Sequence, residues 1–288
     1  MDIVVQILLN AVIAGAIYSL LALGFNLIYS TARFFDLGYG ALTAVGGYSV
    51  FFLYKILGLP LIPSIIFGMI MAGILGWGVS ELVYRPLRAR KASNTVLLVA
   101  ALGVLTVIQA GIAILFTSQF QTLSRYVAEQ QTYTILGGVI TQTQVLILAA
   151  GLIIMVLLGV VLKYTRVGKA VRAVADDEEV ATIVGINAQR IMGGVFFVGA
   201  MIGGLAGISV GFDTGIQPTM GLALLLKGVI AAIIGGIGNV WGGVIGAFVL
   251  ALVENLGAWQ FSGEWKDAIA FLVLILFLLF RPKGILGK

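Results

Sequence analysis

Residues 3–29 read I-V-V-Q-I-L-L-N-A-V-I-A-G-A-I-Y-S-L-L-A-L-G-F-N-L-I-Y and contain no charged side chain. About 20 apolar residues in a helix are enough to cross the hydrocarbon core of a bilayer. A signal peptide would have a shorter apolar core behind a basic N-terminal region, whereas only Met1 and Asp2 precede this stretch. The sequence therefore predicts a retained first transmembrane helix.

The rest of the chain is similarly apolar. Of its 288 residues, 60% are hydrophobic and 10% are charged, and the mean hydropathy of +1.13 excludes a water-soluble domain. We expect one all-α transmembrane domain over residues 1–288, a polytopic bundle of about 8–10 helices. The predicted spans lie near 5–29, 37–58, 61–83, 95–116, 144–162, 191–211, 222–238, 240–256 and 268–280. Only Gly235-Gly236-Ile237-Gly238-Asn239 separates the seventh from the eighth, so one of these two is alternatively a half-helix or a re-entrant segment.

The positions of Lys and Arg predict the orientation in the membrane. Three clusters hold 12 of the 17 basic residues: Arg85, Arg88, Arg90 and Lys91; Lys163, Arg166, Lys169, Arg172 and Arg190; Arg281, Lys283 and Lys288. With nine spans, all three clusters fall on one side. The opposite loops carry only Arg125 and Lys266 against Glu129, Asp213, Glu264 and Asp267. Because basic residues concentrate in cytoplasmic loops, we expect an external N-terminus and a cytoplasmic C-terminus.

Several kinds of catalytic site are excluded. The chain has no cysteine and no histidine, which removes thiolate and imidazole chemistry and most zinc and haem sites. It also lacks a G-x-x-x-x-G-K-[ST] phosphate-binding loop and a Ser/His/Asp set. We therefore expect no enzyme activity, metal or cofactor. The net charge of +5 arises beside the predicted spans and does not indicate nucleic-acid binding.

Ionisable residues inside the predicted spans are few, and such residues are candidates for function because their burial in lipid is costly. They are Asp36, paired with Arg33, together with Lys227 and Glu254. So sparse a set argues against a proton- or sodium-coupled carrier. Lys227 is open to two interpretations, a residue of a translocation path or a structural partner of backbone carbonyls. Glu254 lies near a predicted outer end, where we expect it to be solvated or capped.

Glycine recurs at four-residue spacing in two predicted helices. The chain has 39 glycines, and two of these runs are Gly199, Gly203, Gly207 and Gly211, and Gly238, Gly242 and Gly246. Small residues on one stripe let helix backbones approach closely in a membrane. The pattern predicts close helix packing, and its functional alternative is sliding or unwinding of a helix during transport.

Residues 163–190 form the most informative polar stretch. Its middle is rich in alanine and is bounded by Gly168 and Gly185, which predicts a cytoplasmic helix of about four turns. Val171, Val174 and Ala181 fall near one face, and Arg172 and Asp176 are spaced to form an i,i+4 pair. The stretch is either a solvated loop helix or a helix that transmits motion from a partner's groove.

Four segments in order resemble the permease subunits of branched-chain amino-acid ABC importers, specifically the H-type of the H/M pair. They are Gly15–Tyr29 with Gly46-Gly47-Tyr48, Thr165–Asn187, Lys227 with the glycine-rich run to Gly242, and Arg281–Gly287. The likeness runs from about Asn10 to Gly287. It implies that residues 163–190 couple the bundle to an ATPase, through Gly168, Arg172, Ala173, Asp176, Ala181 and Gly185. Candidates for the translocation path are Asp36, Tyr39, Lys227, Gly235, Gly236, Gly238 and Asn239.

The resemblance also implies partners and a location. A second permease chain (M-type), two ABC ATPase subunits and an external solute-binding protein would assemble with this chain in the prokaryotic plasma membrane, in contact with membrane lipid and not with nucleic acid. Many members have an Asn-x-x-His-Gly run where this chain has Asp36-Leu37-Gly38-Tyr39-Gly40. The resemblance therefore implies that the solute is a branched-chain amino acid or, as in related importers, another amino acid, an amide or urea. The rival hypotheses are a self-sufficient secondary carrier or channel and a purely structural membrane subunit.

Overall fold

The computed structural model describes residues 2–123 and 131–286. Arg125, Glu129, Gly287 and Lys288, which entered the sequence interpretation, lie outside these ranges. The described residues form mainly helices, some extended by short π-helical (η1, η2) or 3-10 (η4) turns. The elements are α1 (Asp2–Ala32), α2 (Gly38–Val50), η1 (Phe51–Ile56), α3 (Leu61–Val79), η2 (Ser80–Tyr84), α4 (Arg85–Ala89), α5 (Asn94–Phe116), β1 (Thr132–Ile135), β2 (Gly138–Thr141), α6 (Gln142–Tyr164), α7 (Arg166–Asp176), α8 (Glu178–Ile183), α9 (Ala188–Asp213), α10 (Met220–Gly235), α11 (Val240–Gln260), η4 (Gly263–Trp265) and α12 (Lys266–Phe280).

Six of the helical stretches in the described ranges are long and apolar enough to cross a membrane. They are Ile3–Ala32, Leu61–Ala89, Asn94–Phe116, Gln142–Tyr164, Ala188–Asp213 and Val240–Gln260. Three further predicted spans form shorter helices: α2 continued by η1, α10 and α12. With 16 residues, α10 is only about 24 Å long. The predicted helical bundle is confirmed, and six of its described helices are long enough to cross a membrane.

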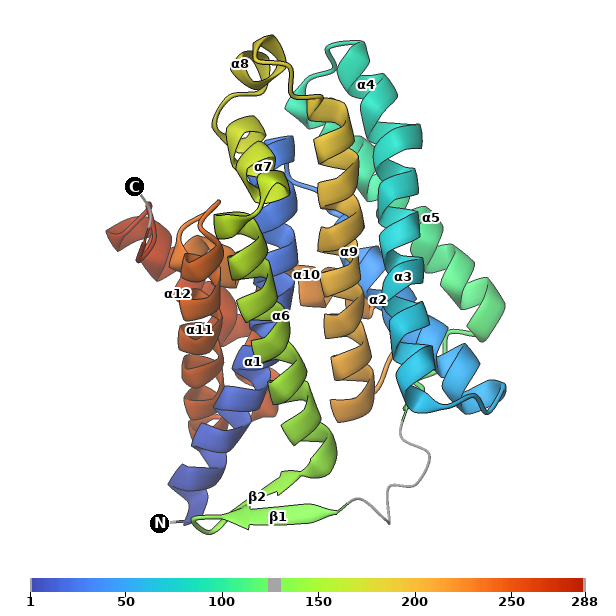
Figure 1. Cartoon of the computed structure of the whole chain (residues 1–288). Coiled ribbons are helices and arrows are strands. Elements are labelled where there is room, and N and C mark those ends of the chain that lie inside the picture. Colours follow the sequence, from blue (N-terminus) through green and yellow to red (C-terminus); the bar gives the residue numbers. More distant parts are fainter. Residues whose placement is uncertain (1, 124–130, 287–288) are drawn as a thin grey trace.

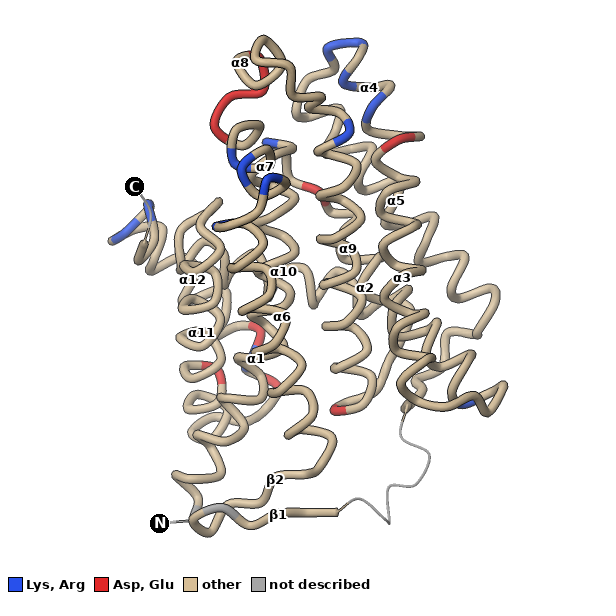
Figure 2. The backbone as a smooth tube through the Cα atoms, viewed as in Figure 1, with Lys and Arg blue, Asp and Glu red and all other residues tan. Residues whose placement is uncertain are grey.

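The long helices run between two ends of the molecule that hold different elements (Figure 1). One end holds the start of α1 and the antiparallel hairpin β1–β2, in which Thr132 pairs with Thr141. The other end holds α4, α7 and α8, and most of the Lys and Arg residues lie here (Figure 2). We call this the basic end. The predicted basic clusters therefore share one end of the molecule, as far as its residues are described.

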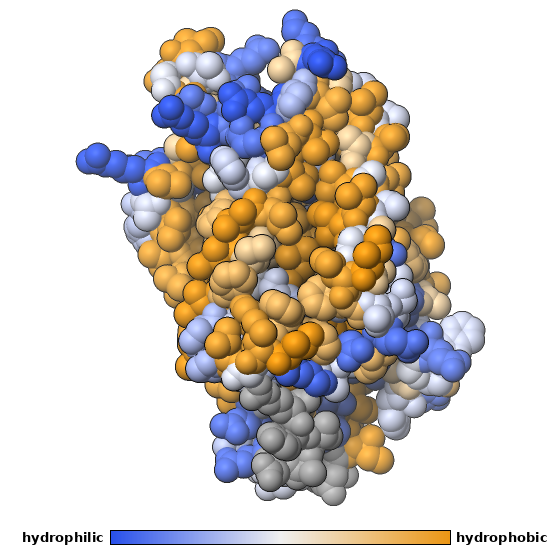
Figure 3. All heavy atoms as spheres, turned by 90° about the vertical axis from the view of Figure 1, so that its right-hand side faces the viewer, coloured by the Kyte–Doolittle hydropathy of each residue, from blue (hydrophilic) through white to orange (hydrophobic). Residues whose placement is uncertain are grey.

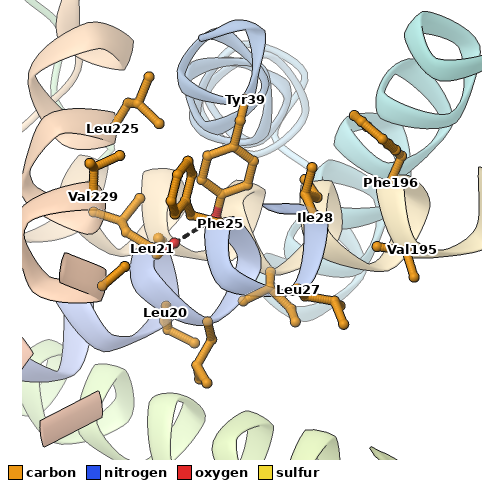
Figure 4. Close-up of a cluster of buried hydrophobic side chains, with 14 of the residues drawn as sticks. Leu20, Leu21, Phe25, Leu27, Ile28, Tyr39, Val195, Phe196, Leu225 and Val229 are labelled. Atoms are coloured by element: carbon orange, nitrogen blue, oxygen red, sulfur yellow. Dashed lines mark hydrogen bonds between the residues drawn. The ribbon is translucent and has the colours of Figure 1, made fainter. Parts of the chain in front are cut away.

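The centre of the bundle is formed by α1 and α9, which contact each other. Helix α1 also contacts α10 and α11, and α9 contacts α2 and α3. Figure 4 shows Leu21, Phe25 and Ile28 of α1 gathered with Tyr39 of α2 and Phe196 of α9. The predicted glycine packing is confirmed at Gly207, where an added Cβ would overlap the Thr43 carbonyl oxygen. Gly46 of α2 packs in the same way against the backbone of Gly204. These contacts bring α2 and α9 together without intervening side chains.

The outside of the bundle is apolar. Figure 3 shows hydrophobic side chains covering much of the face that lies on the right in Figure 1, where α3 and α5 run. Leu82, Val107, Ile114 and Leu115 are among the exposed residues. Since exposed apolar surface of this extent is stable only against lipid or another apolar protein surface, it supports insertion in a bilayer.

The structure differs from the sequence prediction in two places. The single four-turn helix expected between Gly168 and Gly185 is two helices, α7 and α8, because Asp177 leaves the helical conformation with φ −155° and ψ 116°. Its side chain accepts hydrogen bonds from the backbone of Glu179 and Val180, at 2.9 Å and 3.0 Å. The hairpin β1–β2 was also not expected.

Candidate functional site

The segment α7–α8 is fixed to the end of α6 by a tight turn. Thr165 caps α7 by accepting a hydrogen bond from the Gly168 amide at 3.0 Å. A Cβ at Gly168 would overlap the carbonyl oxygens of Val161 and Leu162. Any larger residue at Gly168 must therefore move α7 away from α6. This places the sequence-predicted Gly168 where it sets the position of the whole segment.

The far end of the segment is held on α9 by a small apolar cluster. Val174 of α7 and Ala181 of α8 are buried against Ala188 at the start of α9, with Ala173 packed beside them. Gly185 ends α8 with φ +88°, a left-handed conformation that favours glycine. The Ile186 amide then donates to the Ala181 carbonyl at 3.0 Å. The predicted apolar face of the segment is thus confirmed.

The predicted pair of Arg172 and Asp176 is not formed. The Arg172 guanidinium donates instead to the carbonyl of Leu162 at the end of α6. Nearby, the Arg33 guanidinium donates to the Ala175 carbonyl, so it does not pair with Asp36. Both cations therefore fasten α7 to the membrane-crossing helices through backbone carbonyls.

An ion pair that the sequence did not reveal joins α8 to α4. Arg88 Nη2 lies 2.5 Å from Glu178 Oε2, and Arg88 also donates to the Ala32 carbonyl at 3.2 Å. The pair borders a cavity of about 570 Å³ between α4, α8 and α9, whose lining includes Tyr84 and Phe196. Arg88 was interpreted only as part of a basic loop, because nothing local in the sequence pairs it with Glu178, 90 residues away.

Asp36 and Tyr39 lie in the core beside the end of α1. Tyr84 donates to Asp36 Oδ1 at 2.5 Å, and the Gly38 amide donates to the same oxygen at 2.8 Å. The Tyr39 hydroxyl donates to the Leu21 carbonyl at 3.2 Å, and its ring fills the space left by Gly203. Both side chains are buried. They tie α2 to α1, η2 and α9.

Lys227 is the centre of a charged cluster in the half of the bundle away from the basic end. Its Nζ lies 2.5 Å from Glu254 Oε1 and 2.8 Å from Asp267 Oδ1. The Tyr18 hydroxyl donates to Glu254 Oε2 at 2.7 Å. The cluster therefore joins α1, α10, α11 and α12.

For Glu254 and for Lys227, one of the alternatives considered from the sequence does not match the structure. Glu254 is not solvated, because its side chain is 0% exposed and holds two partners. Lys227 bonds carboxylates and not backbone carbonyls. A buried carboxylate requires such a compensating charge.

The glycine-rich turn between α10 and α11 is a close backbone contact. A Cβ at Gly235 would overlap the Gly242 carbonyl, and Gly236 and Gly238 have φ values of +109° and +83°. The Gly238 amide donates to buried Asn26 of α1 at 3.0 Å. Asn239 caps α11 by accepting from the Gly242 amide at 3.1 Å.

The C-terminal segment lies against this turn. The amides of Ile285 and Leu286 donate to the carbonyls of Ile234 and Gly235, at 2.8 Å and 2.9 Å. The Asn239 side chain also donates to the Leu286 carbonyl at 3.1 Å. The turn and the segment after α12 therefore form one unit.

Comparison with known proteins assigns a family. Residues 7–278 match the family described as "Branched-chain amino acid transport system / permease component". The chain belongs to this permease family. It is 30% identical over 295 residues to the high-affinity branched-chain amino acid transport system permease protein BraD of Pseudomonas aeruginosa, covering 98% of this chain and 95% of that protein. It is also 30% identical over 298 residues to LivH of Escherichia coli strain K12, with the same coverage.

A solved structure shares the fold. PsaBC from Streptococcus pneumoniae in complex with Fab matches with a TM-score of 0.55 at 14% identity, over 95% of this chain and 91% of that chain. The permease is thus a multi-pass membrane protein that serves transport and is not itself an enzyme.

None of the cavities described here is lined by all the candidate path residues of the permease. Asp36 and Tyr39 lie beside α1, Lys227 lies in the charged cluster, and Gly238 and Asn239 line a second cavity of about 770 Å³ near α7. Each has a structural contact, so their role in a path stays a prediction. The coupling candidates do form one continuous unit, α7–α8.

Proposed function

We propose that this permease is the membrane subunit of an ATP-driven importer for branched-chain or related amino acids, delivered by an external solute-binding protein. The relatives BraD and LivH are named for high-affinity branched-chain amino acid transport, and the likeness covers nearly the whole chain. The N-terminus lies outside and the basic end lies in the cytoplasm, following the preference of basic residues for the cytoplasmic side.

The observation that carries the proposal is the apolar tip of α8. Val180, Ile183 and Val184 are 55%, 83% and 69% exposed at the basic end, where α8 lies beyond the ends of α1 and α9 (Figure 1). Apolar side chains in this position outside the bundle indicate a protein contact. An ATPase subunit that contacts this tip moves α8, and the Arg88–Glu178 pair and the turn at Gly168 carry the movement into α4 and α6. A second permease and a second ATPase complete the assembly.

Purification from the native membrane in mild detergent tests the assembly. Mass spectrometry is expected to identify a second hydrophobic permease and phosphate-loop ATPases with this chain. Recovery of the chain alone, from a preparation that preserves other membrane complexes, would contradict the proposal and favour a secondary carrier.

Reconstituted transport tests the coupling. With the partners and ATP, vesicles are expected to take up leucine, isoleucine or valine, and Ile183→Asp is expected to abolish uptake and ATPase stimulation while membrane insertion is unchanged. Arg172→Glu and Gly185→Val are expected to reduce both activities for the same reason. Leu82→Ser provides a control change on an exposed apolar residue outside α8. Normal coupling by Ile183→Asp would remove α8 from the ATPase contact, and uptake of only urea or an amide would change the solute.

A further inference from the structure

The cavity of about 770 Å³ lies at the basic end, between the end of α1, the α6–α7 turn and the α10–α11 turn. Three cationic side chains line it, Arg33, Lys163 and Arg172, together with one carboxylate, Asp176. A site of this charge attracts an anion.

The three cations have no acidic partner among the described residues. Arg33 and Arg172 each donate to a backbone carbonyl, which leaves their charges uncompensated. Lys163 makes only a cation–π contact, with its Nζ 5.3 Å from the centre of the Tyr164 ring. By contrast, Arg85, Arg88 and Lys227 all form ion pairs. The cavity thus brings together three cations that form no ion pair among the described residues.

The cavity lies where apolar helices end. It begins at Leu27 and Tyr29, near the end of α1, and includes Leu162 of α6. Trp241, which is 50% exposed, packs its ring on Gly159 of α6 at the cavity edge. Tryptophan and tyrosine concentrate at the level of lipid headgroups. On the membrane side of this level, Leu152, Ile153 and Val156 of α6 are apolar and exposed.

We propose that this cavity binds the phosphate headgroup of an anionic phospholipid from the adjacent leaflet. Arg33, Lys163 and Arg172 contact the phosphate, and the acyl chains lie along the apolar face of α6. Basic pockets between membrane helices have the charge and depth for such headgroups. The lipid then joins α1, α7 and the α10–α11 turn at one point. This inference rests on membrane insertion and the cavity, and not on the direction of transport or the solute.

Lipid retention by the purified full chain tests the proposal. Native mass spectrometry after exchange into neutral detergent is expected to show one retained phosphatidylglycerol and little phosphatidylcholine at equal concentration. Inorganic phosphate and glycerol 3-phosphate distinguish a lipid from a free anion. Displacement by either at concentrations comparable to the lipid would assign the cavity to a soluble phosphate and overturn the lipid assignment, as would equal retention of phosphatidylcholine.

A matched pair of lysines locates the site. Lys163 and Lys169 are both exposed and lie near the start of α7, but only Lys163 lines the cavity. A basic residue near an anionic surface contributes about fivefold in affinity. Lys163→Gln is therefore expected to weaken phosphatidylglycerol retention about fivefold, and Lys169→Gln by less than twofold. Lys163 forms no hydrogen bond in the described structure, so this variant is expected to fold normally.

The double variant Arg33→Gln/Lys163→Gln is expected to weaken retention about 25-fold, if each cation contributes independently. Equal losses of lipid retention for Lys163→Gln and Lys169→Gln would show that the lipid is attracted diffusely to the basic end. That result would contradict a specific site in the cavity. Retention unchanged in the double variant, with a normal elution profile, would also overturn it. If an acidic segment of the ATPase occupies the cavity, lipid is retained by the chain alone but is absent from the purified complex, which again contradicts the proposal.

Discussion

The charged cluster around Lys227 and the segment α7–α8 are built from contacts of different kinds. Lys227 is 12% exposed and Glu254 0%, and their cluster joins four helices and reaches the surface at Asp267, which is 71% exposed. The Arg88–Glu178 pair of the basic end is 24% and 41% exposed and joins two short helices at the surface. Breaking a buried pair leaves an uncompensated charge in a medium that cannot solvate it, whereas an exposed pair is replaced by water.

This difference distinguishes the helices joined by the Lys227 cluster, which must stay together, from the segment α7–α8, which can move. The buried cluster holds α10, α11 and α12 against α1, and the backbone contact of Gly235 with Gly242 adds to it. The segment α7–α8 is held by a small apolar cluster, capping contacts and one partly exposed ion pair. We infer that movement caused by a partner is confined to α7, α8 and the helix ends they touch.

The largest loss of stability is expected from Lys227→Met. Removing one partner of a buried pair costs about 3–5 kcal/mol, because Glu254 keeps its charge and loses its counter-ion. Thermal unfolding in detergent, followed by size-exclusion chromatography, measures this loss. Glu254→Gln in the same background is expected to restore part of the stability. Lys55→Met is the control, since Lys55 forms no ion pair among the described residues, although it donates to the Thr122 carbonyl and lies over the Phe51 ring. Wild-type stability of Lys227→Met would remove the distinction between the two regions.

The second-largest loss of stability is expected from Gly207→Val. Its side chain would overlap the Thr43 carbonyl, which belongs to the backbone and cannot rotate away, so α2 and α9 must separate. Overpacking of this kind costs about 3 kcal/mol. Gly103→Val is the matched control, because nothing lies within 4 Å of a Cβ at Gly103. The same folded yield for both variants would contradict close packing as the role of the glycine stripe.

The membrane bundle was predictable from the sequence, since apolar length and glycine spacing depend on neighbours along one helix. Each predicted span coincides with a helix, and Gly207 packs as its spacing indicates. The partners of Lys227 and Arg88 were not predictable, because they lie 27 to 90 residues away on other helices. A single sequence contains no information on which distant charges meet.

Two missed features did have local signals. Asp177 followed by Glu178 and Glu179 is typical of a helix N-cap, and it marks the start of α8. Residues 132–141 read T-Y-T-I-L-G-G-V-I-T, two runs rich in β-branched residues around a glycine pair, which is typical of a hairpin. Both signals were weaker than the surrounding helical pattern.

Arg88→Glu tests whether the ion pair at the basic end serves coupling more than stability. Because the pair is partly exposed, its loss is expected to lower the free energy of unfolding by about 1 kcal/mol or less. Transport by the reconstituted assembly is expected to fall severalfold, since α8 loses its link to α4 and like charges now meet. Exchange of the two charges in Arg88→Glu/Glu178→Arg is expected to restore uptake. A variant with a large loss of stability and normal uptake would show that the pair is structural and does not couple.

The smallest change in stability is expected from alanine substitutions at two glycines on α3 that are two residues apart. A Cβ at Gly76 would overlap that of Ala200, whereas nothing lies within 4 Å of a Cβ at Gly78. Gly78→Ala is therefore expected to stabilise the protein by about 0.5 kcal/mol, because alanine loses less backbone entropy in a helix. Gly76→Ala is expected to destabilise it, because α3 and α9 must shift apart. Parallel thermal unfolding of the two variants measures the difference. Equal stabilisation by both would mean that α3 is free to move against α9, and the part that moves during transport would then extend beyond α7 and α8.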